Sequence, residues 1–157
     1  MDKDKQINYT RRVSQANKTE LVVITYDIIL DNIADAEAVL ASDVNEYRKN
    51  LKQAQRFLGE LMRALDYQYE LSKNLLQLYS YVQRILVASD ISGTDKGLES
   101  AKNVISGLRK AFNEIAAQDS SGSVMENTQA IFAGLTYGRG SLNETDMNIG
   151  SNRGFLA

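Results

Sequence analysis

The stretch KTELVVITYDIILDNIADAEAVLA, residues 18–41, decides the fold of this chain. It holds no Gly and no Pro, and its apolar residues recur at helical spacing. Asn17 and Glu20 have the spacing of a capping box, in which each side chain accepts a hydrogen bond from the other residue's backbone N–H. The sequence therefore predicts a helix that begins at residue 18 and ends near residue 41.

The apolar residues of this helix surround nearly its whole circumference. Leu21 to Ile24 and Ile28 to Leu30 together are wider than the stripe of about 100° that a helix on a bundle surface needs. Two interpretations stay open here. Either the helix is central and packs against two neighbours, or it offers a groove for another chain's helix, which the arm or the tail covers when empty.

Downstream of this stretch, the same periodicity predicts three more helices. One runs from about residue 43 to 66, and the next resumes the apolar stripe at Leu71, with no Gly or Pro to mark where it begins. Ser92-Gly93-Thr94 supplies a stop and a cap before the last helix, which ends near residue 117. Because short connections join antiparallel neighbours, the predicted fold is an all-α, antiparallel up-and-down four-helix bundle over residues 18–117.

Both ends of the chain differ from this bundle. Residues 1–17 carry scattered apolar side chains among charges and are predicted to form an N-terminal arm, with Arg11 and Arg12 solvated. Residues 118–157 hold six of the ten glycines, which indicates a flexible tail. Within it, Ser123 and Glu126 have capping-box spacing, so a short fifth helix is expected near 124–133, acting as a reversible cover for the groove.

The composition excludes most catalytic and metal sites. With no His and no Cys, the chain cannot form a Ser-His-Asp or Cys-His group, a zinc finger or a disulfide, nor the Glu-x-x-His pairs of a di-iron bundle. Carboxylate pairs such as Asp31 and Asp35 are expected on solvated helix faces. We expect no enzymatic activity, no metal and no cofactor.

Charge and hydropathy also limit the partners and the location. The net charge of −2 offers no strong field for nucleic acid. No run of about 18 uncharged apolar residues is present, so membrane insertion is not expected. Because the amino terminus shows no signal peptide, the expected location is the cytoplasm.

Three motifs, in order along residues 8–117, resemble the FliS family of flagellar export chaperones. No single motif is specific, because each fits an ordinary amphipathic helix, but their combination is. The residues that carry the resemblance are Asn8-Tyr9-Thr10 and Thr19-Glu20-Leu21 with Thr25-Tyr26-Asp27; Ala54-Gln55 through Leu61, Leu65 and Asp66; and Tyr79-Ser80-Tyr81 with Arg84-Ile85-Leu86-Val87-Ala88-Ser89.

The resemblance implies a non-enzymatic cytoplasmic chaperone. Such a protein would bind the disordered carboxy-terminal segment of flagellin, prevent its premature polymerisation and assist its delivery to the flagellar export gate. The alternative is a non-enzymatic helical interaction module with a different, folded partner. The matched positions expected to bind the partner, whether as groove or as core, are Tyr9, Leu21, Ile24, Thr25, Ile28, Leu58, Leu61, Leu65, Tyr81 and Leu86.

Overall fold

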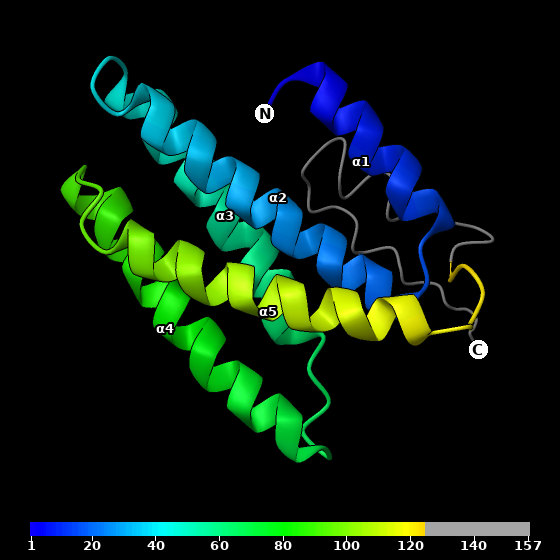
Figure 1. The fold of residues 1–157 in the computed structure, drawn as a ribbon. Helices are drawn as coiled ribbons and strands as arrows, with labels where there is room; N and C mark the ends of the chain where they lie inside the picture. Colours follow the sequence, from blue (N-terminus) through cyan, green and yellow to red (C-terminus); the bar gives the residue numbers. More distant parts are fainter. Residues whose placement is uncertain (125–157) are drawn as a thin grey trace, which may run out of the picture.

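The computed structural model describes residues 1–124, and over that range every regular element is a helix (Figure 1). In chain order the helices are α1 (Lys3–Gln15), α2 (Lys18–Val39), α3 (Val44–Arg63), α4 (Glu70–Ser92) and α5 (Leu98–Gln118). Helix α2 packs on α3 and α5, and α4 packs on the same two helices from the other side. The predicted all-α bundle is therefore confirmed.

Local signals explain where α2 begins and where α4 ends. Asn17 and Glu20 form the predicted capping box, with both side-chain to backbone hydrogen bonds at 2.8 Å. Helix α4 ends where expected, at Gly93, whose φ of 68° is left-handed. The expected cap at Thr94 is wrong, because α5 begins only after Gly97 and Thr94 instead shares a hydrogen bond with Ser92.

The main core lies between α2, α3, α4 and α5 and includes three fully buried tyrosines. Tyr26 and Tyr79 share a hydrogen bond, their hydroxyl oxygens 2.6 Å apart, and Tyr47 donates to the Thr94 carbonyl at 2.6 Å. Burial raises the pKa of Tyr26 and of Tyr79. Each buried hydroxyl therefore stays protonated and has a partner, which stabilises one arrangement of the helices.

The predicted N-terminal arm is itself a helix, α1, which runs antiparallel to α2 (Figure 1). Asp2 caps it by accepting a hydrogen bond from the Lys5 backbone N–H at 2.9 Å. Tyr9 and Val13 of α1 are buried against Ile24 and Ile28 of α2, in an apolar cluster of their own. Helix α2 is thus central in the bundle, and α1 covers its remaining apolar face; that this face is a groove for another chain's helix stays a prediction.

The last described residues return to the connection between α1 and α2. Asp119 accepts a hydrogen bond from the Thr19 hydroxyl at 2.8 Å, and the Val124 backbone N–H donates to the Ala16 carbonyl at 3.1 Å. We call residues 119–124 the strap. The predicted fifth helix, near 124–133, lies outside the described residues apart from its first position, as do residues 134–157 of the expected tail.

Candidate partner-binding surface

The face of α2 beneath α1 has an apolar centre and an acidic edge. Ile24 and Ile28 are 3% and 2% exposed under α1. Asp27, Asp31 and Asp35 recur at every fourth position, so they share one side of α2. We call these five residues the α1 seat.

Each carboxylate of the α1 seat accepts a hydrogen bond from a side chain of α1. Because the three bonds follow the two helices in opposite directions, they fix the antiparallel register of α1. They run from Arg12 Nη2 to Asp27 Oδ2 at 2.9 Å, from Tyr9 Oη to Asp31 Oδ2 at 2.7 Å, and from Lys5 Nζ to Asp35 Oδ1 at 3.2 Å.

These contacts correct two expectations from the sequence. Asp31 and Asp35 do not lie on a solvated face, because they bind α1, and Asp35 also pairs with the amino-terminal ammonium group at 3.3 Å. Arg12 is likewise an ion-pair partner of Asp27 rather than a solvated arm residue. Lys5, Arg12 and the amino-terminal ammonium group therefore hold α1 on α2.

Asp27 is the point where three helices meet. Asp27 Oδ2 accepts a hydrogen bond from Arg12 Nη2 of α1, and Asp27 Oδ1 accepts one from Arg109 Nε of α5. This hydrogen bond raises the pKa of Arg109, so the guanidinium group stays charged. Asp27 thus joins the cover helix to the bundle.

Two further pKa shifts favour the seated position of α1. Burial, together with the hydrogen bond to Asp31, raises the pKa of Tyr9, so the hydroxyl remains a donor. Burial opposes charge on Lys5, but its hydrogen bond and ion pairs with Asp35 and Asp31 raise its pKa overall. At neutral pH both groups are therefore in the protonated form that the seat binds.

Helix α1 has the properties of a removable cover. It is 13 residues long, a length at which an isolated helix is marginal in water, so it depends on its contacts with α2. Its buried side chains form a cluster separate from the main core, with Phe57 packed against both. Ile24 and Ile28 are therefore buried in the cluster with α1 and not in the main core.

The structure divides the predicted partner-binding residues into distinct places. Tyr9, Leu21, Ile24 and Ile28 come together in the cluster between α1 and α2. The other predicted residues lie elsewhere: Leu58, Leu61 and Leu86 in the main core, Leu65 against that core, Thr25 half-buried with its hydroxyl donating to the Leu21 carbonyl at 2.7 Å, and Tyr81 40% exposed on α4.

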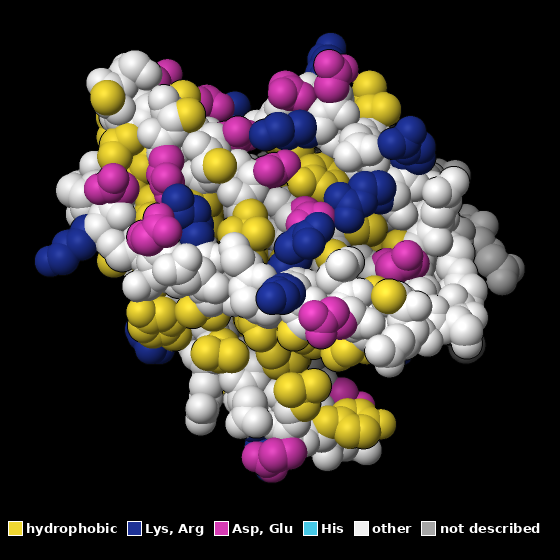
Figure 2. Space-filling model, viewed as in Figure 1, with side chains coloured by type: hydrophobic (Ala, Val, Ile, Leu, Met, Phe, Trp, Pro, Cys, Tyr) yellow, Lys and Arg dark blue, Asp and Glu magenta, His cyan; other side chains and the backbone are white. Residues whose placement is uncertain are grey.

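A second apolar surface lies on α4 and on the connection before it. Hydrophobic side chains gather there, below α5 in the view of Figure 2. Exposed apolar side chains that gather on one face favour contact with a partner. Its exposed large side chains are Tyr67, Tyr69, Leu71, Leu78 and Tyr81.

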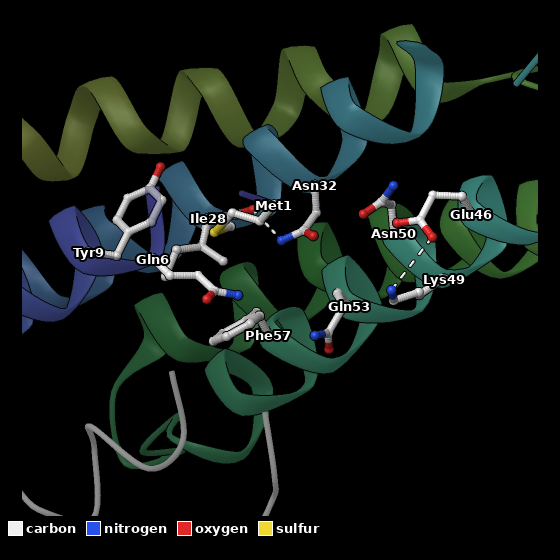
Figure 3. A pocket seen from close by; sticks show the side chains of 10 residues that line it. All are labelled: Met1, Gln6, Tyr9, Ile28, Asn32, Glu46, Lys49, Asn50, Gln53 and Phe57. Carbon is white, nitrogen blue, oxygen red and sulfur yellow. Dashed lines mark hydrogen bonds and ion pairs between the residues drawn. The ribbon is translucent and has the colours of Figure 1, made fainter. Parts of the chain in front are cut away.

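A cleft of about 160 Å³ opens beside the α1 seat, between α1, α2 and α3 (Figure 3). Two buried amides, Asn32 and Asn50, line it, and reasoning from the sequence did not select them. The signal was present, because Asn32 lies four residues after Ile28 and Asn50 lies four residues before Ala54, so each shares a helix face with an apolar residue. A polar residue at a core-facing position is unusual enough to mark a site.

Comparison with known proteins places the chain in context. A family model described as "Flagellar protein FliS" matches residues 1–119, which span α1 and the whole bundle. No curated protein matches the chain. None of the helices within residues 1–124 has the length and hydropathy needed to cross a lipid bilayer.

Proposed function

Because this chain belongs to the FliS family of flagellar export chaperones, we propose that it binds the carboxy-terminal segment of flagellin in the cytoplasm. Binding keeps that segment from polymerising early and presents it to the export apparatus. The observation that carries this proposal is the α1 seat, an apolar surface that a short helix of the same chain covers.

A disordered segment can replace α1 by folding as it binds. An amphipathic helix with apolar residues at positions i and i+4 would pack on Ile24 and Ile28 as Tyr9 and Val13 do. Ordering that segment costs about 1–2 kcal/mol per residue in backbone entropy. The buried apolar area must offset this cost, so a segment longer than α1 has the advantage.

The other predicted residues have different roles in this proposal. Tyr81 and the exposed apolar side chains of α4 give a second surface for a segment that extends beyond the α1 seat. Leu58 and Leu86 are fully buried, so they support the groove from within rather than contact the partner directly. Thr25 and Leu21 lie at the edge of the seat, where the partner helix would end.

This function requires no catalysis, and we propose that the chain is not an enzyme. Its site consists of apolar side chains and of carboxylates that are already paired with cations. A folded partner is the other possibility, and the rigid apolar surface of α4 would suit one. The state of the partner before binding separates the two.

The test uses the full chain and a synthetic peptide with the sequence of the flagellin carboxy-terminal segment. We expect calorimetry to show binding, and circular dichroism to show that the peptide gains helix as it binds. Ile24→Asp should weaken binding, because a charge then lies in the seat. The matched control is Ile115→Asp, at a position that is 51% exposed on α5, which should bind normally. Absence of binding to the unaltered protein would refute the proposal.

A further inference from the structure

The cleft beside the α1 seat is polar at one end and apolar at the other. Figure 3 shows Tyr9, Ile28 and Phe57 on one side and Asn32 and Asn50 toward the other. Its volume of about 160 Å³ is well below the roughly 300–1,000 Å³ of small-molecule pockets. It therefore has the size for one side chain of a partner rather than for a cofactor.

The two buried amides of the cleft have unused hydrogen-bonding capacity. Asn50 is 4% exposed, and within residues 1–124 its side chain makes no hydrogen bond. Asn32 is 2% exposed and donates one bond, from Nδ2 to the Ile28 carbonyl at 2.8 Å. Within residues 1–124, Gln83 Oε1 is the side-chain atom that is fully enclosed without a partner, so the polar atoms of Asn50 and Asn32 that make no hydrogen bond open onto the cleft. Both therefore favour a polar group that enters the cleft.

The charges around the cleft are already neutralised. Glu46 and Lys49 on its rim pair with each other at 3.5 Å, and the ammonium group of Met1 pairs with Asp35 at 3.3 Å. A charged group entering the cleft would find no free counter-charge among the described lining residues. A neutral group that both donates and accepts hydrogen bonds is the better match, and a primary amide is such a group.

Helix α1 already presents an amide at this place. Gln6 lines the cleft one helical turn before Tyr9, so the two side chains share a face of α1. A partner helix that replaces α1 on Ile28 would carry its own residue past Asn32 and Asn50. The cover helix thus indicates which residue type the replacing helix needs.

We propose that the cleft receives one Asn or Gln side chain of the partner segment, and that Asn32 and Asn50 select it. This inference rests on the proposed function, because the segment that occupies the α1 seat also passes the cleft. The amide head bonds the two asparagines, and its aliphatic stem lies against Ile28 and Phe57. An apolar side chain in the same position leaves Asn50 unpaired and binds less well.

The first test replaces Asn50 by Leu, which has similar size and no polar atom. In the full chain, Asn50→Leu should leave the midpoint of thermal unfolding unchanged or higher, because the substitution removes an amide that makes no hydrogen bond within residues 1–124. Its affinity for the flagellin peptide should nevertheless fall about tenfold. Asn103→Leu, an exposed asparagine on α5, is the control with the same change in helix propensity, and it should bind normally. Normal binding by Asn50→Leu would overturn the inference.

The second test finds the amide in the partner. Each Asn and Gln of the flagellin peptide is replaced by Leu in turn, and the affinity of every peptide is measured against the unaltered protein and against Asn50→Leu. One replacement should weaken binding to the unaltered protein about tenfold and leave binding to Asn50→Leu unchanged. If no position shows this coupling, the cleft does not bind an amide.

The third test does not depend on flagellin. N-acetylglutamine methylamide is titrated into ¹⁵N-labelled full chain, with N-acetylnorleucine methylamide as the control, and the side-chain NH₂ signals of Asn50 and Asn32 are followed by NMR. Saturable shifts with the glutamine compound alone support the cleft, even where the flagellin peptide fails to bind and the proposed function falls. Shifts with neither compound, or equal shifts with both, would overturn it.

Discussion

Tyr9 of α1 and Asp31 of α2 are joined by a hydrogen bond of 2.7 Å, the middle one of the three that fix the register of α1 on its seat. Tyr9 also contributes its ring to the apolar cluster with Ile28. One side chain thus serves both the apolar and the polar part of the interface, and its hydroxyl can be removed without changing the ring.

Tyr9→Phe should therefore weaken the docking of α1 and leave the bundle intact. Hydrogen bonds to charged groups contribute about 1.5–3 kcal/mol, so we expect the backbone amides of α1 to exchange with solvent at least tenfold faster. Amides of α3 and α4 should keep their protection. Tyr69→Phe, at a position that is 65% exposed, is the control. Unchanged exchange in α1 would show that the hydrogen bond does not hold the helix.

Alkaline pH should release α1. The pKa of Tyr9 is raised when α1 is seated, so the seated state binds the proton more tightly than the released state does. Its contribution is complete below the ordinary tyrosine pKa of about 10 and is lost as the pH rises above that value. Lys5, whose pKa is also raised, adds to the loss in the same direction.

Methyl NMR signals of Ile28, recorded between about pH 8 and pH 11.5, report this release. We expect them to shift above about pH 10 in the unaltered protein, and Tyr9→Phe should remove the part that tyrosine contributes. Release of α1 already below pH 8 would contradict the assignment.

The fold followed from the sequence wherever a local signal marks an element. The Asn17–Glu20 capping box and the Gly93 stop are such signals, and both are confirmed. The break between α3 and α4 has no Gly or Pro; there Asp66 accepts a hydrogen bond from the Gln68 backbone N–H at 3.0 Å, in a polar turn. Asp is common in helices as well, so the sequence left this boundary open.

The candidate site was less predictable, because burial depends on which helices meet. Ile28 and Leu58 both belong to apolar stripes, yet one lies under α1 and the other in the main core. The Asp2 cap is a local signal for α1, but its position on α2 follows from contacts with three aspartates 15 to 30 residues away, which no local pattern displays. Tertiary contacts also decided that Asp31 and Asp35 are paired.

A carboxylate introduced under α1 and one introduced in the main core should change the thermal stability of the protein to different extents. Ile28→Asp should displace α1, which lets the carboxylate reach water, while the four-helix bundle keeps a cooperative thermal transition. Leu58→Asp has no such escape, because Leu58 is fully buried, and should cost several kcal/mol of stability and unfold the protein. Circular dichroism melts compare them directly, and equal destabilisation would mean that α1 belongs to the core.

Deletion of residues 1–15 should also leave a cooperative unfolding transition. Helix α1 packs mainly on α2, and its apolar cluster is separate from the main core. The shortened protein should bind a dye that reports exposed apolar surface, because Ile24 and Ile28 lose their cover. Loss of the transition in a circular dichroism melt would show that α1 is needed for folding.

Asp27→Asn should destabilise the seat and the bundle together. The substitution removes the charge that Arg12 and Arg109 share at a carboxylate whose side chain is only 14% exposed. We expect a loss of about 1–3 kcal/mol in the free energy of unfolding, measured with urea. Asp95→Asn, on the exposed connection between α4 and α5, should have no effect.

Removal of residues 125–157 tests the expectation that the tail is a reversible cover. These residues follow the strap, which ends at the connection between α1 and α2, so their local concentration near the α1 seat is high. If they compete with the partner, the flagellin peptide will bind more tightly to the protein that ends at Val124. Equal or weaker binding by a folded variant would refute this role.

The hydrogen bonds of α1 and those of the strap differ in how far apart along the chain their partners lie. Those between α1 and α2 join residues 15 to 30 positions apart, whereas those of the strap join residues 100 to 109 positions apart. Contacts that are close in sequence form faster, and the amino-terminal helices leave the ribosome first. We therefore expect α1 to pack on the apolar face of α2 before the strap returns to the connection between them. Ile24 and Ile28 would then be covered by α1 from an early stage of folding, and a partner would bind them only by displacing α1.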